Sequence, residues 1–142
     1  MNVASACVDA SLVLMLLLPD ERSTQVDTLF SGWTQGDVTL VGPPLLYVEV
    51  PSVLREAVYF GRISPQDGER AFETFCGLEI TIRDRTDLHL LAWELAKEFR
   101  RPRLYDSMYL AVARAEPCEL WTGDLRLVNA VNRPWVRWVG AN

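Results

Sequence analysis

The sequence has few of the residues that stabilise a fold through covalent cross-links or zinc. Its 142 residues include 3 cysteines and 1 histidine, and Cys7, Cys76 and Cys118 show no paired spacing. A disulfide framework or a zinc site is therefore not expected, and reduced cytosolic thiols fit better. The single histidine also disfavours a hydrolase that uses histidine as its general base.

Long hydrophobic runs and an excess of positive charge are also missing. The longest uncharged run, Val38 to Val48, is shorter than the roughly 20 residues that cross a bilayer. The aliphatic stretch Leu12 to Leu18 follows Asp9 and has no Lys or Arg before it, unlike a signal peptide. The net charge of −5 excludes a globally basic nucleic-acid binder, but not an enzyme with a local basic patch or a metal ion. We expect a cytoplasmic protein with no membrane partner.

The overall composition is that of a globular domain. Hydrophobic residues make up 49% of the chain and charged residues 23%. A chain of 142 residues matches one domain and is long enough to bury a core without cross-links. We therefore expect residues 1–142 to form a single domain.

Hydrophobic periodicity predicts strands that alternate with helices. The predicted strands are Val3–Val8, Thr39–Val41, Leu78–Ile82, Glu119–Thr122 and Trp135–Val139. The predicted helices run from Ser11 to Pro19, Arg22 to Trp33, Leu45 to Phe60, Pro65 to Phe75, Thr86 (as cap) to Phe99, Tyr105 to Ala115, and from Asp124 to Val131. This order predicts an α/β fold, a three-layer α/β/α sandwich with a mainly parallel central sheet of four to five strands. Inside the third helix, Pro51 leaves the carbonyl of Tyr47 without a donor, which predicts a kink or a restart.

Four acidic residues lie where a metal site could form. Asp9 ends the first predicted strand and Asp124 follows the fourth, and functional groups of such folds gather at the carboxyl ends of the strands. Glu49 and Asp106 lie on predicted helices among apolar residues. An isolated buried carboxylate costs several kcal/mol or more, so four of them make sense if they converge on a cation. Ligand sets made only of oxygen suit Mg²⁺, with Mn²⁺ as the alternative.

Each of these acids also has a simpler interpretation. Asp9, Asp106 and Asp124 lie at or near predicted helix starts, where Asp commonly caps a helix. Glu49, which we expect in the middle of its helix, would then be a half-exposed residue on the helix flank. Both interpretations remain open from the residues alone.

Four motifs in order carry a resemblance to a known family. They are VDASLVL with Asp9 and Ser11, YVEVPSVLREA with Glu49, LYDSMYLAVA with Asp106, and LWTGDLRLV with Thr122 and Asp124. Over its whole length the chain resembles a PIN domain, and most closely the VapC-type ribonuclease toxins of prokaryotic toxin–antitoxin pairs. The resemblance implies a PIN-like domain over residues 1–142 and a divalent-metal-dependent endoribonuclease that hydrolyses RNA phosphodiester bonds. It also implies a cognate antitoxin protein as partner and a homodimer.

The resemblance and the chemistry of the motifs together assign roles to individual residues. The predicted catalytic residues and metal ligands are Asp9, Glu49, Asp106 and Asp124, and Glu49 could instead orient the attacking water. The hydroxyls of Ser11 and Thr122 would hold the carboxylates in place.

A basic cluster precedes the third motif. Arg100, Arg101 and Arg103 are candidates for contacts with substrate phosphates, or simply neutralise the end of the preceding helix. Two other functions remain open: a non-catalytic PIN-like interaction module, and a PIN nuclease of RNA processing that is not a toxin.

Overall fold

The computed structural model describes residues 4–19 and 22–140. Within these ranges the chain forms five strands and seven helices: β1 (Ser5–Val8), α1 (Ala10–Leu17), α2 (Ser23–Gln35), β2 (Thr39–Gly42), α3 (Leu46–Tyr59), α4 (Pro65–Cys76), β3 (Ile80–Ile82), α5 (Leu88–Glu98), α6 (Tyr105–Ala115), β4 (Glu119–Thr122), α7 (Leu125–Val131) and β5 (Val136–Trp138). The predicted order of strands and helices is confirmed. Val3, where we expected the first strand to begin, lies outside the described residues.

The strands form one parallel sheet in the order β3-β2-β1-β4-β5. β1 is central, and its Cys7 pairs with Val41 of β2 on one side and with Leu120 of β4 on the other. The chain adds β2 and β3 outward from β1 and then returns to place β4 against the free side of β1. The strand order therefore reverses between β1 and β4, and in open α/β sheets the crevice at this point is where ligands bind.

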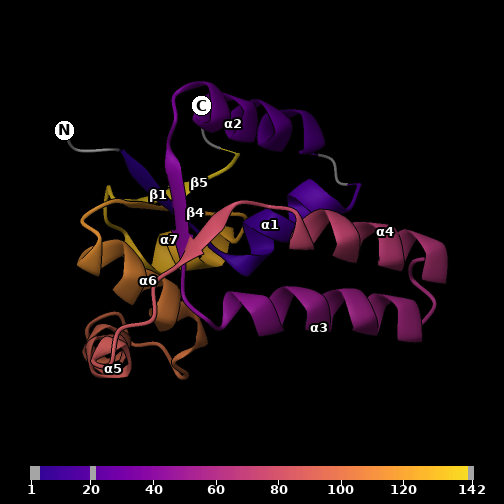
Figure 1. Ribbon diagram of the computed structural model, residues 1–142. Helices are drawn as coiled ribbons and strands as arrows, with labels where there is room; N and C mark the ends of the chain where they lie inside the picture. The colour runs from indigo at the N-terminus through magenta and orange to yellow at the C-terminus, as the bar shows by residue number, and fades with distance from the viewer. Residues whose placement is uncertain (1–3, 20–21, 141–142) are drawn as a thin grey trace.

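Helices cover both faces of the sheet, so the predicted α/β sandwich is confirmed. α6 packs on β1, β2 and β4, and α5 packs on α6, whereas α1 contacts β4 and packs with α2, α3 and α4. Figure 1 shows α5 and α6 on one side of β2 and the antiparallel pair α3 and α4 extending from the other. The central strands are buried as a result, and Cys7, Val8 and Leu120 have no exposed surface.

Two local details differ from the predictions. Of the kink or restart predicted at Pro51, the restart is absent, because α3 runs unbroken from Leu46 to Tyr59. Pro51 lies in the second turn, where its missing N–H costs one helical bond, and the buried Val50 and Leu54 on either side hold the helix against the core. α5 begins at Leu88 rather than directly after Thr86, and its cap residue Asp87 pairs through its side chain with Arg85.

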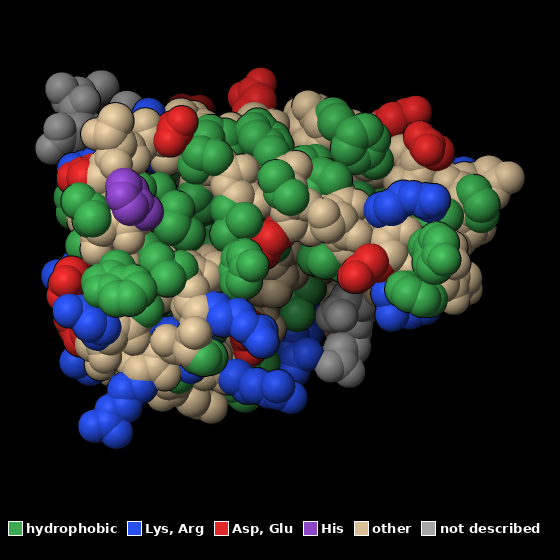
Figure 2. Space-filling view, turned by 90° about the horizontal axis from the view of Figure 1, so that it is seen from below, with side chains coloured by type: hydrophobic (Ala, Val, Ile, Leu, Met, Phe, Trp, Pro, Cys, Tyr) green, Lys and Arg blue, Asp and Glu red, His purple; other side chains and the backbone are tan. Residues whose placement is uncertain are grey.

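The surface contains both apolar and basic areas. Figure 2 shows the molecule from below, where hydrophobic side chains gather beside a group of Lys and Arg side chains. Leu90 and Trp93 of α5 are among the exposed apolar residues, with 61% and 57% of their surface accessible. Across the two described ranges, no helix is long and apolar enough to cross a membrane.

Candidate active site

Asp9 connects the central strand β1 to helix α1 at the carboxyl end of the sheet. It is the cap residue of α1, and its Oδ1 accepts a hydrogen bond from the Leu12 backbone N–H at 3.0 Å. Only 6% of Asp9 is exposed. Burial raises the pKa of Asp9 from 3.8 to about 6, even though the hydrogen bonds from Thr122, Leu12 and Ser11 lower it.

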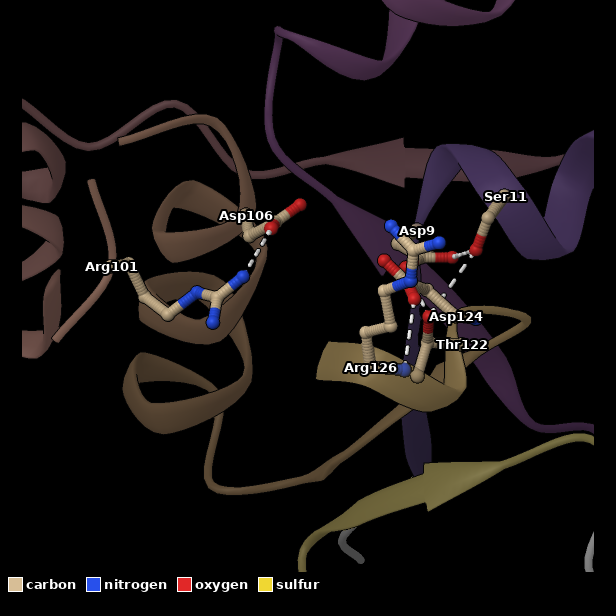
Figure 3. A network of polar contacts seen from close by, with 7 residues as sticks. All are labelled: Asp9, Ser11, Arg101, Asp106, Thr122, Asp124 and Arg126. Atoms are coloured by element: carbon tan, nitrogen blue, oxygen red, sulfur yellow. Dashed lines mark hydrogen bonds and ion pairs between the residues drawn. The ribbon is translucent and has the colours of Figure 1, made fainter. Parts of the chain in front are cut away.

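Two hydroxyls hold the Asp9 carboxylate from both sides. Ser11 Oγ donates to Asp9 Oδ1 at 2.7 Å, and Thr122 Oγ1 donates to Asp9 Oδ2. Each hydroxyl has one proton, so both protons point at Asp9, and the oxygens accept from the backbone of the next loop. Ser11 accepts from Gly123 N–H at 3.0 Å, and Thr122 accepts from Asp124 N–H at 2.9 Å. The two hydroxyls therefore join the end of β1 to the end of β4, as Figure 3 shows.

Asp124 follows β4 and caps the short helix α7. Its Oδ1 accepts from the Arg126 backbone N–H at 3.0 Å, and the residue is partly exposed. Asp9 and Asp124 are therefore both helix caps, as the simpler interpretation predicts. Capping occupies part of each carboxylate and leaves other lone pairs directed elsewhere, so it does not exclude a second role.

Asp106 lies in the first turn of α6 and does not cap it. Its Oδ2 lies 3.6 Å from Nη2 of Arg101, whose side chain is 22% exposed. Burial raises the pKa of Asp106, the Arg101 guanidinium opposes this, and the charge of Asp124 adds to it. In Figure 3 the Asp106 carboxylate points from α6 toward the cluster of Asp9, Ser11, Thr122 and Asp124.

Glu49 lies in the first turn of α3 rather than in the middle of a helix as predicted. Glu49 is partly buried, next to the exposed Val48. Burial raises the pKa of Glu49, and the charges of Asp106 and Asp9 raise it further. The sequence analysis missed Tyr109, which is 2% exposed and lies near Glu49 and Asp9. No hydrogen bond of standard geometry reaches its hydroxyl, and the one available clue was its position one helical turn after Asp106.

The four predicted acids therefore face one region at the carboxyl end of the sheet. The charges of Asp106 and Asp9 raise the pKa of Glu49. In the same way the charge of Asp106 raises the pKa of Asp9, and the charge of Asp124 raises that of Asp106. The site is nevertheless open: no three His, Cys, Asp or Glu side chains of the described residues lie close enough to form a ready-made metal site.

The other predicted arginines are placed differently from Arg101. Arg100 and Arg103 are exposed, and neither forms an ion pair with any carboxylate in the described part of the chain. Arg101 alone of the cluster contacts one of the acids. Beside α6, Arg101 is therefore oriented by its ion pair with Asp106, whereas Arg100 and Arg103 have no carboxylate partner among the described residues.

The sequence has curated relatives. It is 33% identical over 120 residues to a VapC ribonuclease of Mycobacterium bovis and to ribonuclease VapC9 of Mycobacterium tuberculosis, which covers 84% of this chain and 86% of each relative. The chain belongs to the VapC ribonuclease family. Membership confirms the resemblance that the four motifs predicted and the enzyme class, a ribonuclease. No family model matches the chain.

Solved structures of VapC proteins share the fold of this VapC-family chain. The M. tuberculosis toxin VapC20, described as cleaving the sarcin-ricin loop, superposes with a TM-score of 0.68 at 19% identity, covering 93% of this chain and 98% of that one. VapBC2 of Rickettsia felis, bound to a DNA fragment of its promoter, gives 0.68 at 11% identity over 94% and 96%. A toxin–antitoxin complex from Klebsiella pneumoniae gives 0.62 at 19% over 92% and 94%. At these identities the likeness concerns the fold.

Proposed function

We propose that this protein is a divalent-metal-dependent endoribonuclease that hydrolyses RNA phosphodiester bonds as the toxin of a prokaryotic toxin–antitoxin pair. The observation that carries the proposal is the electrostatic coupling of four carboxyl groups from β1, α3, α6 and the end of β4. The pKa values of Asp9, Glu49 and Asp106 are all raised, partly by one another. A fold gains nothing from such repulsion, whereas a site for a cation requires these groups.

The donor set fits a hard divalent cation. Asp9, Glu49, Asp106 and Asp124 offer carboxylate oxygens only, which suits Mg²⁺, or Mn²⁺ as the alternative. Bound there, such an ion lowers the pKa of a water molecule and stabilises the charge that develops on the scissile phosphate. Ser11 and Thr122 fix the orientation of Asp9, so this carboxylate is the most rigid of the four.

Glu49 and Arg101 are the residues suited to moving a proton and holding a phosphate. Glu49 is partly exposed with a raised pKa, so it is placed to orient the attacking water and to accept its proton. Arg101 has a buried Nε without a hydrogen-bond partner and a terminal nitrogen at Asp106. Its planar fork matches the geometry of a phosphate that occupies the space beside Asp106. Arg100 and Arg103 add positive charge along the path of the RNA.

The partners of the protein follow from its family and surface. VapC structures solved with an antitoxin support a cognate antitoxin here. Leu90 and Trp93 are exposed three residues apart on one face of α5, and exposed apolar patches mark protein contacts. We assign this face to a homodimer in the cytoplasm, and light scattering of the Trp93→Asp variant should report a monomer.

The test is cleavage of defined RNAs by the purified protein with Mg²⁺, Mn²⁺ or EDTA. We expect cleavage with either metal, none in EDTA, and a loss of at least about 100-fold in Asp106→Asn. Asp27→Asn is the matched control, because Asp27 is an exposed acid of α2 that lies outside all four motifs. Millimolar Mg²⁺ should also raise the melting temperature of the wild type, since a ligand of the native state stabilises it.

Two results would contradict the proposal. If Asp106→Asn cuts RNA as fast as Asp27→Asn, the acids are not the catalytic centre. If no RNA is cut with either metal and the melting temperature does not respond to them, the protein is the non-catalytic interaction module. Growth arrest by the protein expressed alone, relieved by a co-expressed neighbouring reading frame, separates a toxin from an RNA-processing nuclease.

A further inference from the structure

A hollow of about 500 Å³ adjoins the first turn of α6, and of its lining only Arg103 has a role above. It is lined by Leu45, Arg103, Leu104, Tyr105 and Met108. Tyr105 is the residue before Asp106, and Leu45 accepts the helical hydrogen bond of Glu49 at 2.9 Å. Two of the lining residues are thus bonded to residues of the site, one along the chain and one through the backbone hydrogen bond.

The lining has the chemistry of a surface for a flat, apolar ring attached to a phosphate. Tyr105 is 59% exposed although it is a large aromatic residue in the first turn of α6. Met108, three residues later, lies on the same side of the helix and is partly buried. Arg103 is exposed and pairs with no carboxylate of the described chain, which leaves its charge available at the rim.

We propose that this hollow binds an unpaired nucleobase of the RNA substrate, stacked on the ring of Tyr105, with Arg103 on an adjoining phosphate. The inference rests on the proposed function and adds to it the residue that contacts a base. Neighbouring side chains of a helix diverge by about 100°. A phosphate held by Arg101 beside Asp106 and a base stacked on Tyr105 therefore lie around the helix from one another, as in a single strand whose base is turned outward.

The geometry favours a single-stranded RNA over a duplex. Bases of unpaired RNA are splayed out and stacked on aromatic side chains, whereas bases inside a duplex present no face to such a ring. Stacking tolerates any base, so Tyr105 supplies affinity, while selection among bases falls to the neighbouring Leu45, Leu104 and Met108. The volume lies in the range of small-ligand sites and is open on one side, as a strand that passes through requires.

Binding of fluorescein-labelled RNA octamers in EDTA tests the inference without cleavage. One probe is an octaadenylate, and the other is an octamer of abasic nucleotides with the same phosphates. Because the carboxylates repel the phosphates of both probes equally, this repulsion cancels in the ratio of the two affinities. Tyr105→Ala should weaken binding of octaadenylate by about 5- to 100-fold and leave the abasic octamer unchanged. Tyr105→Phe should bind as the wild type, because the ring and not the hydroxyl makes the contact. Tyr59→Ala, which removes an exposed tyrosine at the far end of α3, should have no effect.

Arg103→Ala should weaken both octamers equally and reduce the salt dependence of binding by about one phosphate contact. The inference is overturned if Tyr105→Ala binds octaadenylate as the wild type does. It is also overturned if that variant changes the oligomeric state instead, because the hollow is then covered by a second copy of the chain. If the wild-type protein cuts no RNA with either metal but still binds octaadenylate more tightly than the abasic octamer, the proposed nuclease activity is refuted and the base-binding site is supported.

Discussion

Replacing Asp9 by asparagine should make the metal-free protein more stable at neutral pH while abolishing cleavage. Asp9 is buried, and burial together with the charge of Asp106 raises its pKa from 3.8 to about 6. The folded state therefore holds the proton more tightly than the unfolded state, and stability falls as pH rises from about 4 to about 6. One pKa unit corresponds to about 1.4 kcal/mol, so above this range the ionised Asp9 costs the fold about 3 kcal/mol.

Asparagine can keep two of the three hydrogen bonds without the charge and reverse the direction of the third. Its oxygen can accept from Leu12 N–H and Ser11, and its amide can donate to the second lone pair of Thr122 Oγ1. We expect the free energy of unfolding in EDTA at about pH 7.5 to rise by about 1–3 kcal/mol, which corresponds to roughly 3–10 °C in melting temperature. The gain should nearly vanish at about pH 4, where Asp9 is already protonated in the folded state.

Urea titrations of wild type, Asp9→Asn and the surface control Asp27→Asn at both pH values would measure this. The control should stay within about 0.5 kcal/mol of wild type. A loss of stability in Asp9→Asn at neutral pH, or a gain of the same size at both pH values, would refute the argument that Asp9 is a charge buried at a cost to the fold. The expected result would show that the ionised Asp9 lowers the stability of the fold and is kept because the activity requires it.

Two further substitutions test the packing beneath the site. Thr122→Val should lower the free energy of unfolding by about 1–3 kcal/mol, because the buried Asp9 loses a donor. The exposed Thr28, changed to Val, should alter it by less than about 0.5 kcal/mol, and equal effects in urea titrations would mean that the Thr122 hydroxyl is not needed. Leu120→Ala should cost about 2–5 kcal/mol, since Leu120 has no exposed surface in the middle of the sheet. Val53→Ala on the exposed side of α3 is its control, and a comparable loss there would contradict the assignment of the core.

Elements whose limits are marked by local chemistry could be predicted from the sequence. Glu119–Thr122 and Tyr105–Ala115 have the predicted bounds, since alternation, helical spacing and the following Pro117 all act within a few residues. α4 begins at Pro65 as predicted because Ser64 accepts from the Asp67 backbone N–H at 3.1 Å. Where tertiary packing competes with a local rule, the helix continues past the breaker, as at Pro51, where the predicted restart is absent.

The candidate acids could also be selected from the sequence, but their surroundings could not. Buried carboxylates at strand ends are recognisable by residue type, and their role as metal ligands stays a prediction. The predicted start of α3, Leu45, lies one residue before the observed start at Leu46, so Glu49 belongs to the first turn in both and its description as mid-helix was wrong. Tyr109 could not be selected from the sequence, since a buried tyrosine in a helix has no pattern that distinguishes it from its apolar neighbours.

The amino-acid sequence by itself determined the order of the strands and helices, the family, and the choice of the four candidate acidic residues, because each of these depends on short segments of the chain. Only the tertiary structure decided that β4 lies beside β1, which brings the hydroxyls of Ser11 and Thr122 together across 111 positions of sequence. Only it decided that Arg101 faces Asp106 and that Tyr105 stands beside an open hollow. The physical reason is that strand neighbours are chosen by burial of the sheet on both faces, a property of the whole core that no single segment contains.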